Sequence, residues 1–269
     1  MPTFVTDDDV TLSYLDEGSG PVVVLVAGFG APATTWVFQQ DALVRAGYRV
    51  LALDRRGHGD SEAPDHGATM ARHGRDLDNF LTAVGVETAV LMGGSMGAST
   101  VWSYIRTTGT SRVRGVVSVD QTPKMINDAS WPHGFYGLTD ATVDGFFAKG
   151  IPATGHGPST FASLLPVAKL ILRLRSMPRM VSSETPPMRA LLDDHARQDW
   201  RADIRAADVP ILMIAGRNSQ FWPSDHAVVT ARDTAQGQVA LIDSGHAANM
   251  DRPREVNEVV LTFLRGIGY

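Results

Sequence analysis

A serine lies at a glycine-rich point where the chain is expected to turn from a strand into a helix. The sequence GGSMG, residues 93–97, places Ser95 between glycines two positions before and two positions after it. These glycines remove side chains that would clash in so tight a turn. The turn exposes the serine hydroxyl, and the helix N-terminus directs free N–H groups toward a developing oxyanion. We therefore predict Ser95 to be a nucleophile, although a glycine-rich turn with an incidental serine has the same sequence.

A histidine near the C-terminus is suited to activate this serine. His246 follows the last apolar run, in the sequence LIDSGHAANMDRP. If both residues follow strands of one parallel sheet, they meet at the same edge of that sheet. An isolated histidine is more often structural or solvated, but one in this place fits a general base for Ser95.

The elements that would hold these residues follow a regular alternation. Apolar runs rich in β-branched residues alternate with helical stretches, which predicts an α/β fold: a mostly parallel central sheet with helices on both faces. The near-continuous apolar character of the runs suits strands buried on both faces. The alternating segment VTLSYLDEGSG predicts an antiparallel edge hairpin with TFV. The apolar runs cover residues 21–29, 48–54, 88–94, 113–120, 209–216 and 237–245.

One interval lacks strands. Residues 121–205 contain two stretches with a helical apolar stripe, SLLPVAKLILRLR and PPMRALLDDHARQDW, the second with its prolines at a suitable helix start. We predict that this interval is a helical lid inserted over the carboxyl ends of the strands, and that residues 1–120 and 206–269 form the core. Apolar residues of such a lid are expected to contact the ligand.

Four motifs in this order make the chain resemble the α/β-hydrolase superfamily. They are VAGFG, DRRGHGDSEAP, GGSMGAS and SGHAANMDRP, and together they span nearly the whole chain. The resemblance includes the small bacterial esterases, lactonases and cofactor-free haloperoxidases. It implies the α/β-hydrolase fold, catalysis without a cofactor or metal, and an oxyanion hole formed by the backbone N–H groups of Phe29 and Met96. The family usually has histidine at the position of Ala27, so that orienting side chain is absent here.

The acid expected beside the histidine is missing from its usual place. In most such enzymes it lies three residues after the glycine that ends the sixth parallel-type strand, here Gly216, and that position is Ser219. A neutral hydroxyl can orient an imidazole but cannot stabilise the imidazolium. A subset of the superfamily carries its acid at the end of the preceding strand, where this chain has Asp120. An Asx-type turn would also explain that residue; Asp225 and Asp243 are the second and third candidates.

A dinucleotide site is the main competing interpretation of the N-terminal region. Residues 28–33 read G-x-G-x-x-A after a strand, and Asp54 follows about twenty residues later, a pattern typical of dinucleotide binding. Pro32 stiffens the loop that should wrap the pyrophosphate, and the segment after Asp54 continues as the hydrolase motif RRGHGDS. This interpretation also gives Ser95 no role, so we disfavour it.

Composition excludes several other classes. A formal charge of −5 provides no basic surface for nucleic acid, and the absence of cysteine excludes disulfides and thiolate metal sites. His58, His66 and His73 lack metal-ligand spacing. The apolar runs are too short to span a bilayer, and the acidic N-terminus lacks the apolar region of a secretory signal. We therefore expect a cytoplasmic protein with no metal, membrane or nucleic-acid partner; nothing in the sequence indicates its oligomeric state.

These observations predict a serine hydrolase that cleaves a small, largely apolar carboxylic ester or lactone. Ser95 would form the acyl-enzyme, His246 would act as base and acid, and Asp120 would orient the imidazole. Carbon–carbon bond hydrolysis or perhydrolysis on the same groups, or a hydrolase-fold receptor with little turnover, are the alternatives. Aromatic residues that flank the strand ends near this site are expected to line the substrate pocket: Trp131, Tyr136 and Trp222.

Overall fold

The computed structural model describes residues 1–157 and 166–269 in full, together with the backbone of residues 160–165. Its described strands form one sheet in the order β1-β2-β4-β3-β5-β6-β7-β8. The pairs β1–β2 and β2–β4 are antiparallel, and every other neighbouring pair is parallel. The predicted mostly parallel sheet with an antiparallel edge hairpin is confirmed. The strands are β1 (Thr3–Val5), β2 (Thr11–Glu17), β3 (Val22–Val26), β4 (Arg49–Leu53), β5 (Ala89–Gly94), β6 (Val113–Val119), β7 (Ile211–Gly216) and β8 (Gly237–Ile242).

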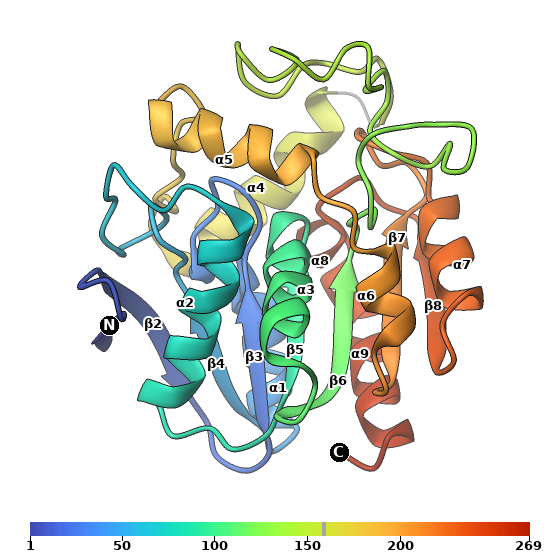
Figure 1. Cartoon of the computed structure of the whole chain (residues 1–269). Coiled ribbons are helices and arrows are strands. Elements are labelled where there is room, and N and C mark those ends of the chain that lie inside the picture. The colour runs from blue at the N-terminus through green and yellow to red at the C-terminus, as the bar shows by residue number, and fades with distance from the viewer. Residues whose placement is uncertain (158–159) are drawn as a thin grey trace.

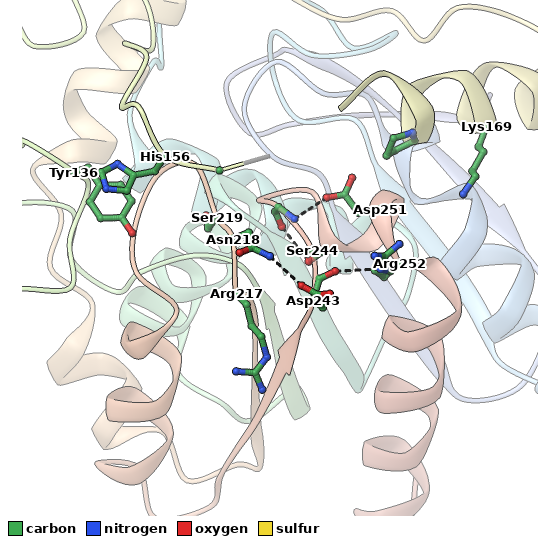
Figure 2. A pocket seen from close by; sticks show the side chains of 13 residues that line it. Tyr136, His156, Lys169, Arg217, Asn218, Ser219, Asp243, Ser244, Asp251 and Arg252 are labelled. Carbon is green, nitrogen blue, oxygen red and sulfur yellow. Dashed lines mark hydrogen bonds between the residues drawn. The ribbon is translucent and has the colours of Figure 1, made fainter. Parts of the chain in front are cut away.

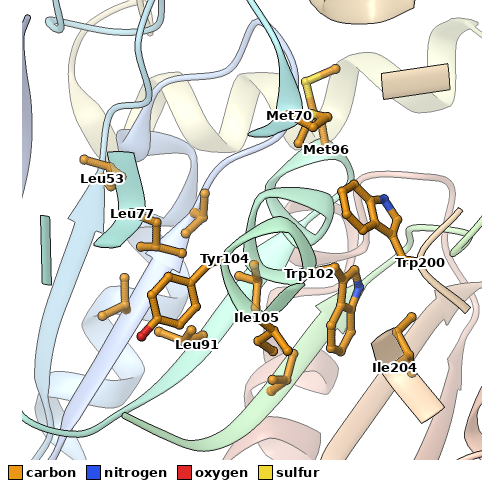
Figure 3. Close-up of a cluster of buried hydrophobic side chains, with 14 of the residues drawn as sticks. Leu53, Met70, Leu77, Leu91, Met96, Trp102, Tyr104, Ile105, Trp200 and Ile204 are labelled. Carbon is orange, nitrogen blue, oxygen red and sulfur yellow. The ribbon is translucent and has the colours of Figure 1, made fainter. Parts of the chain in front are cut away.

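Helices cover both faces of the sheet (Figure 1). Successive residues of a strand point to opposite faces, and β3 shows the result: Val23 and Leu25 pack with one hydrophobic cluster, whereas Val24 and Val26 pack with another. The first cluster is completed by α1 (Val37–Arg45) and α9 (Pro253–Gly266). The second includes residues of α2 (Met70–Ala83), α3 (Met96–Thr108) and α7 (Asp225–Arg232), and Figure 3 shows part of it around Leu77, Leu91 and Trp102. Burial on both faces explains why the central strands are continuously apolar.

The segment between β6 and β7 contains helices and loops, and within its described residues it has no strand of the sheet. It lies over the carboxyl ends of the strands (Figure 1), and α5 (Pro186–Ala196) begins at its prolines, as the sequence predicted. The other helices are α4 (Thr160–Leu174) and α6 (Arg201–Ala206). The predicted boundary at residue 205 falls inside α6, whose Ile204 is buried in the same cluster as residues of α3. α6 therefore packs against α3 beside the sheet.

Two short helices complete the fold, η1 (Ala33–Trp36) after β3 and α8 (Ala248–Asp251) after β8. Both follow carboxyl ends of strands and therefore lie at the edge where the site is expected. None of the helices in the described part of the chain combines the length and apolar character needed to cross a bilayer.

Candidate active site

Ser95 occupies a strained turn between β5 and α3. Its backbone has φ 51° and ψ −130°, in the left-handed region that residues with side chains rarely adopt. The flanking glycines are required by close approach of the backbone: a Cβ at Gly93 would collide with Ala98, and a Cβ at Gly97 would collide with the carbonyl of Val26. The sharp strand-to-helix turn predicted from the sequence is confirmed.

Two backbone N–H groups lie close to this turn. Met96 is the first residue of α3, where N–H groups have no partner within the helix. Phe29 follows Gly28, and a Cβ at Gly28 would lie 3.2 Å from the Cβ of Ser95, so this loop contacts the serine. Neither the Phe29 nor the Met96 N–H takes part in the loop, turn and cap hydrogen bonds of the described residues. Both predicted oxyanion donors therefore stay candidates.

Asp120 and His246 are in direct contact. The Nδ1 of His246 lies 2.7 Å from Oδ2 of Asp120, which follows β6 between the ends of β5 and β7. Asp120 Oδ1 accepts a hydrogen bond from the N–H of Gly216 at 2.9 Å, and Oδ2 accepts one from the hydroxyl of Ser219 at 2.6 Å. Ser219, at the position where the resemblance leads one to expect an acid, therefore donates a hydrogen bond to Asp120.

Asp120 is fully buried, yet it is charged at neutral pH. Burial raises the pKa of this carboxyl, but the hydrogen bond with His246 and the proximity of the His226 and His246 imidazoles outweigh burial and lower the pKa to about 2. His226 is itself fully buried, its Nε2 lies 3.9 Å from Asp120 Oδ1, and neither ring nitrogen has a hydrogen-bond partner among the described residues. The sequence pattern did not identify this second imidazole beside the acid.

The two reserve candidates for the acid lie elsewhere. Asp225 is the first residue of α7. Asp243 follows β8 and accepts a hydrogen bond from Asn218 Nδ2 at 2.9 Å. Within the described residues neither is hydrogen-bonded to His246, which leaves Asp120 as the carboxylate in contact with the imidazole.

Ser95 and His246 line the same pocket, of about 360 Å³. Beside them its described walls contain Thr35 and Asn249 as polar side chains and no Asp, Glu, Lys or Arg. Apolar side chains that line it come from η1, from the segment between β6 and β7 and from the loop after β7: Trp36, Ile151, Leu170, Met177, Met180 and Phe221. A small neutral ligand with apolar groups fits such walls.

None of the three predicted aromatic residues lines this pocket. Trp131 is buried near Arg201, whose guanidinium carbon lies 5.4 Å from the ring centre. Tyr136 stacks on His156 at 3.7 Å between ring centres, at a separate polar cavity of about 600 Å³ (Figure 2). Trp222 is buried behind the site, 5.3 Å from the ring of His246. Sequence proximity to a strand end therefore did not predict which side chains line the pocket of Ser95.

The motif DRRGHGDS supports the loops around Ser95. Asp54 is buried, and its carboxylate accepts hydrogen bonds from the N–H groups of Ala33 at 2.6 Å and Asp60 at 3.0 Å. Both oxygens of this carboxylate thus accept hydrogen bonds from the backbone. Asp54 is therefore not free to bind a ribose hydroxyl, which argues against the dinucleotide interpretation. His58 and His73 contact Arg55, and the described residues contain no cluster of three or more potential metal ligands.

Comparisons with known proteins agree with this architecture. The family described as alpha/beta hydrolase fold matches residues 21–253. A putative non-heme chloroperoxidase of Synechocystis sp. is 28% identical over 270 residues, with 95% of each chain covered. The crystal structure of a bromoperoxidase from Bacillus anthracis superposes with a TM-score of 0.79 at 28% identity, over 98% of this chain and 100% of that one. An esterase from Exiguobacterium antarcticum, 20% identical, shares the fold with a TM-score of 0.78 over 98% of both chains. The chain belongs to the α/β-hydrolase family.

Proposed function

We propose that this protein is a serine hydrolase that cleaves a small, largely apolar carboxylic ester or lactone. One observation carries the proposal: His246 is bonded to a buried, charged Asp120 at 2.7 Å and shares the walls of an apolar pocket with Ser95. A charged carboxylate behind an imidazole, with a strained serine at the same pocket, is the arrangement that serine nucleophiles use.

The chemistry proceeds in two halves. The hydroxyl of Ser95 attacks the acyl carbon while His246 takes its proton, and the resulting imidazolium is stabilised by Asp120. The N–H groups of Phe29 and Met96 bind the oxyanion of the tetrahedral intermediate. His246 then returns the proton to the leaving alcohol, which leaves the acyl group on Ser95. Water attacks this acyl-enzyme with His246 again as base, which releases the acid.

The pocket favours neutral substrates. A carboxylate or ammonium group buried against walls without a charged partner would lose hydration that no described lining residue replaces, which costs several kcal/mol. Neutral acyl chains and lactone rings instead bury apolar surface, with about 0.8 kcal/mol for each methylene group removed from water. We therefore propose uncharged esters or lactones as the substrate class.

The test is turnover of 4-nitrophenyl esters and neutral lactones by the wild type and by Ser95→Ala. We expect Ser95→Ala to lose 10³-fold or more of kcat with an unchanged circular dichroism spectrum, because the nucleophile is gone. A fluorophosphonate probe should label the wild type once and the variant not at all. Full turnover by Ser95→Ala would overturn the nucleophile, and a labelled wild type with negligible turnover across the panel would favour a ligand receptor.

Perhydrolysis is a second candidate because the Synechocystis relative is named a non-heme chloroperoxidase. Hydrogen peroxide in place of water would attack the acyl-enzyme and release a peracid, with no change in the roles of Ser95, His246 and Asp120. Peracid formation from an ester in the presence of hydrogen peroxide, measured beside plain hydrolysis, distinguishes the two acceptors.

A further inference from the structure

A buried arginine lies next to the loop that carries Phe29. Arg55 is 2% exposed, and it makes no ion pair within the described part of the chain. Its Nε donates to the carbonyl of Ala27 at 3.0 Å, and its Nη2 donates to the carbonyl of Gly28 at 2.8 Å. Both acceptors belong to the backbone immediately before Phe29.

Two imidazoles complete the surroundings of this guanidinium. Nη1 lies 3.2 Å from Nδ1 of His73, and Nη2 lies 3.0 Å from Nε2 of His58. A guanidinium can only donate, so both ring nitrogens accept and both rings are neutral. His58 Nδ1, 2.8 Å from the carbonyl of Arg56, is then the protonated nitrogen of its ring and donates there. Burial first, and then the charge of Arg55, hold the pKa of both histidines well below the usual range.

Stability alone does not explain the buried guanidinium of Arg55. A buried cation without a counter-ion is costly, and an apolar side chain of similar volume is often as stable or more stable at such a site. What the arrangement does achieve is a full positive charge aimed at two particular carbonyl oxygens. The reason for retaining it should therefore be sought in those two peptide groups.

The carbonyl of Gly28 and the N–H of Phe29 belong to one peptide unit. None of the peptide bonds in the described residues is cis, so this C=O and N–H point in opposite directions within one plane. Holding the oxygen against Arg55 consequently aims the Phe29 N–H away from Arg55. A hydrogen bond from a cation to the oxygen also polarises the peptide and strengthens its N–H as a donor.

We propose that Arg55 is a positioning residue that aims and polarises the Phe29 N–H as one half of the oxyanion hole, while His58 and His73 hold the guanidinium without neutralising it. The inference rests on the proposed hydrolase function. The ring of Phe29 also packs edge-on against His58, with 6.2 Å between ring centres. Arg55 thus supports the loop whose usual orienting histidine is replaced by Ala27.

The chain offers a matched control in the next residue. Arg56 is also buried, but its guanidinium is bonded to the carboxylates of Asp76 and Asp8 and touches neither carbonyl before Phe29. Arg55→Met and Arg56→Met therefore remove the same side chain from neighbouring buried positions, of which only the first contacts the oxyanion loop.

The experiment compares kcat, KM and the inhibition constant of an arylboronic acid, whose Ser95 adduct is tetrahedral and places an oxygen in the oxyanion hole. Removing a direct oxyanion donor costs about 10²- to 10³-fold, so misdirecting one should cost about 10- to 100-fold in kcat with KM nearly unchanged. We expect Arg55→Met to show that loss and an equal loss of boronate affinity. Arg56→Met should lower the melting temperature and keep kcat within about threefold.

A second variant, Arg55→Lys, covers the case in which Arg55→Met does not fold. It keeps the charge but lacks the planar fork that spans both carbonyls, and we expect at least a tenfold loss of kcat and boronate affinity. Wild-type values in either folded Arg55 variant, or an equal kcat loss in Arg56→Met, would overturn the inference while Ser95→Ala still tests the hydrolase itself. A wild type without turnover would defeat the proposed function instead.

Discussion

Two buried groups of opposite charge, Asp120 and Arg55, lie close to the loops around Ser95, and each is in contact with imidazoles. Asp120 accepts hydrogen bonds from a backbone N–H, a hydroxyl and the imidazole of His246. Arg55 donates to two carbonyls and contacts two imidazoles. The His246 imidazole is 19% exposed and lines the pocket of Ser95, whereas His226, the other imidazole beside Asp120, is buried. The two imidazoles at Arg55, His58 and His73, are also buried.

This difference in sign decides what each imidazole can do. Beside Asp120, a proton arriving on His246 meets a negative charge, so the proposed reaction can pass through an imidazolium. Beside Arg55, a proton arriving on either ring would place two positive charges in contact and remove the acceptor that the guanidinium needs. The surroundings of Asp120 therefore allow His246 to take up a proton during the proposed reaction. The surroundings of Arg55 keep His58 and His73 neutral.

The largest loss of kcat should come from removing the negative charge of Asp120. We expect Asp120→Asn to lower kcat by about 10⁴-fold, because the imidazolium loses its stabilising charge and the imidazole its tautomer. Steady-state kinetics on a 4-nitrophenyl ester would measure this, with circular dichroism to confirm folding. Asp225→Asn is the control and should stay within about twofold. The reverse ranking of the two variants would move the acid to α7.

As the pH falls, the histidines around Arg55 should reduce the stability of the protein at a higher pH than Asp120 does. The pKa values of His58 and His73 are depressed by burial and then by Arg55, and the same two causes lower that of His195 to about 3. Below pH 6.5 the unfolded chain binds these protons and the folded protein does not, so stability falls as the pH falls. Three such groups give a slope that rises toward about 4 kcal/mol per pH unit as the pH falls well below 6.5.

Urea unfolding at pH 7, 6 and 5 measures that slope. Asp120, with its pKa lowered to about 2, contributes stability that is lost only below about pH 4, outside this window. His73→Gln should reduce the slope by about one third, because one of the three buried histidines is then absent. A flat stability between pH 7 and pH 5 would contradict neutral histidines around Arg55.

The same contrast shows what the sequence could predict. The turn at Ser95 is local, since it depends on glycines within two residues, and the strand pattern depends on neighbours within one element. Asp120 and His246 could be brought together because parallel strands end at one edge of the sheet. Each of these inferences needs only local pattern and topology, and the structure agrees with the resulting geometry.

The Arg55 cluster could not be found in this way. Its histidines follow Arg55 by 3 and 18 residues, and its acceptors precede it by 28 and 27. The motif alone does not show that Arg55 is buried, because its surroundings come from α2 and from the loops after β3 and β4. The aromatic residues were misplaced for a related reason: neighbouring loop residues such as Phe221 and Trp222 face different surroundings, and periodicity is absent in loops.

A smaller loss of kcat should follow from removing one hydrogen bond to Asp120 while its charge remains. Ser219→Ala deletes the hydroxyl that donates to Asp120 Oδ2 at 2.6 Å. A hydrogen bond to a charged group contributes about 1.5–3 kcal/mol, but the Gly216 N–H and His246 remain, so we expect a kcat loss of about tenfold. The measurement is kcat beside that of Asp120→Asn. A loss as large as that of Asp120→Asn would mean that Ser219 has a part in the chemistry of its own.

The smallest predicted effect is on KM, and it distinguishes the two cavities near the site. Phe221 lines the pocket of Ser95, and its ring centre lies 4.4 Å from that of His246; Tyr136 lines the polar cavity on the other side of the loop after β7. Truncation of Phe221 to alanine removes part of the apolar wall, worth about 1 kcal/mol for a partly exposed ring, so KM for an apolar ester should rise about fivefold. Tyr136→Ala should leave KM within twofold, because its ring contacts His156 instead of the substrate.

The same two variants assayed with esters of increasing acyl length sharpen the comparison. The increase in KM caused by Phe221→Ala should become larger with each methylene group of the substrate that reaches the missing wall. If Tyr136→Ala alone raised KM, the substrate would occupy the polar cavity, and the proposed preference for uncharged esters would be wrong.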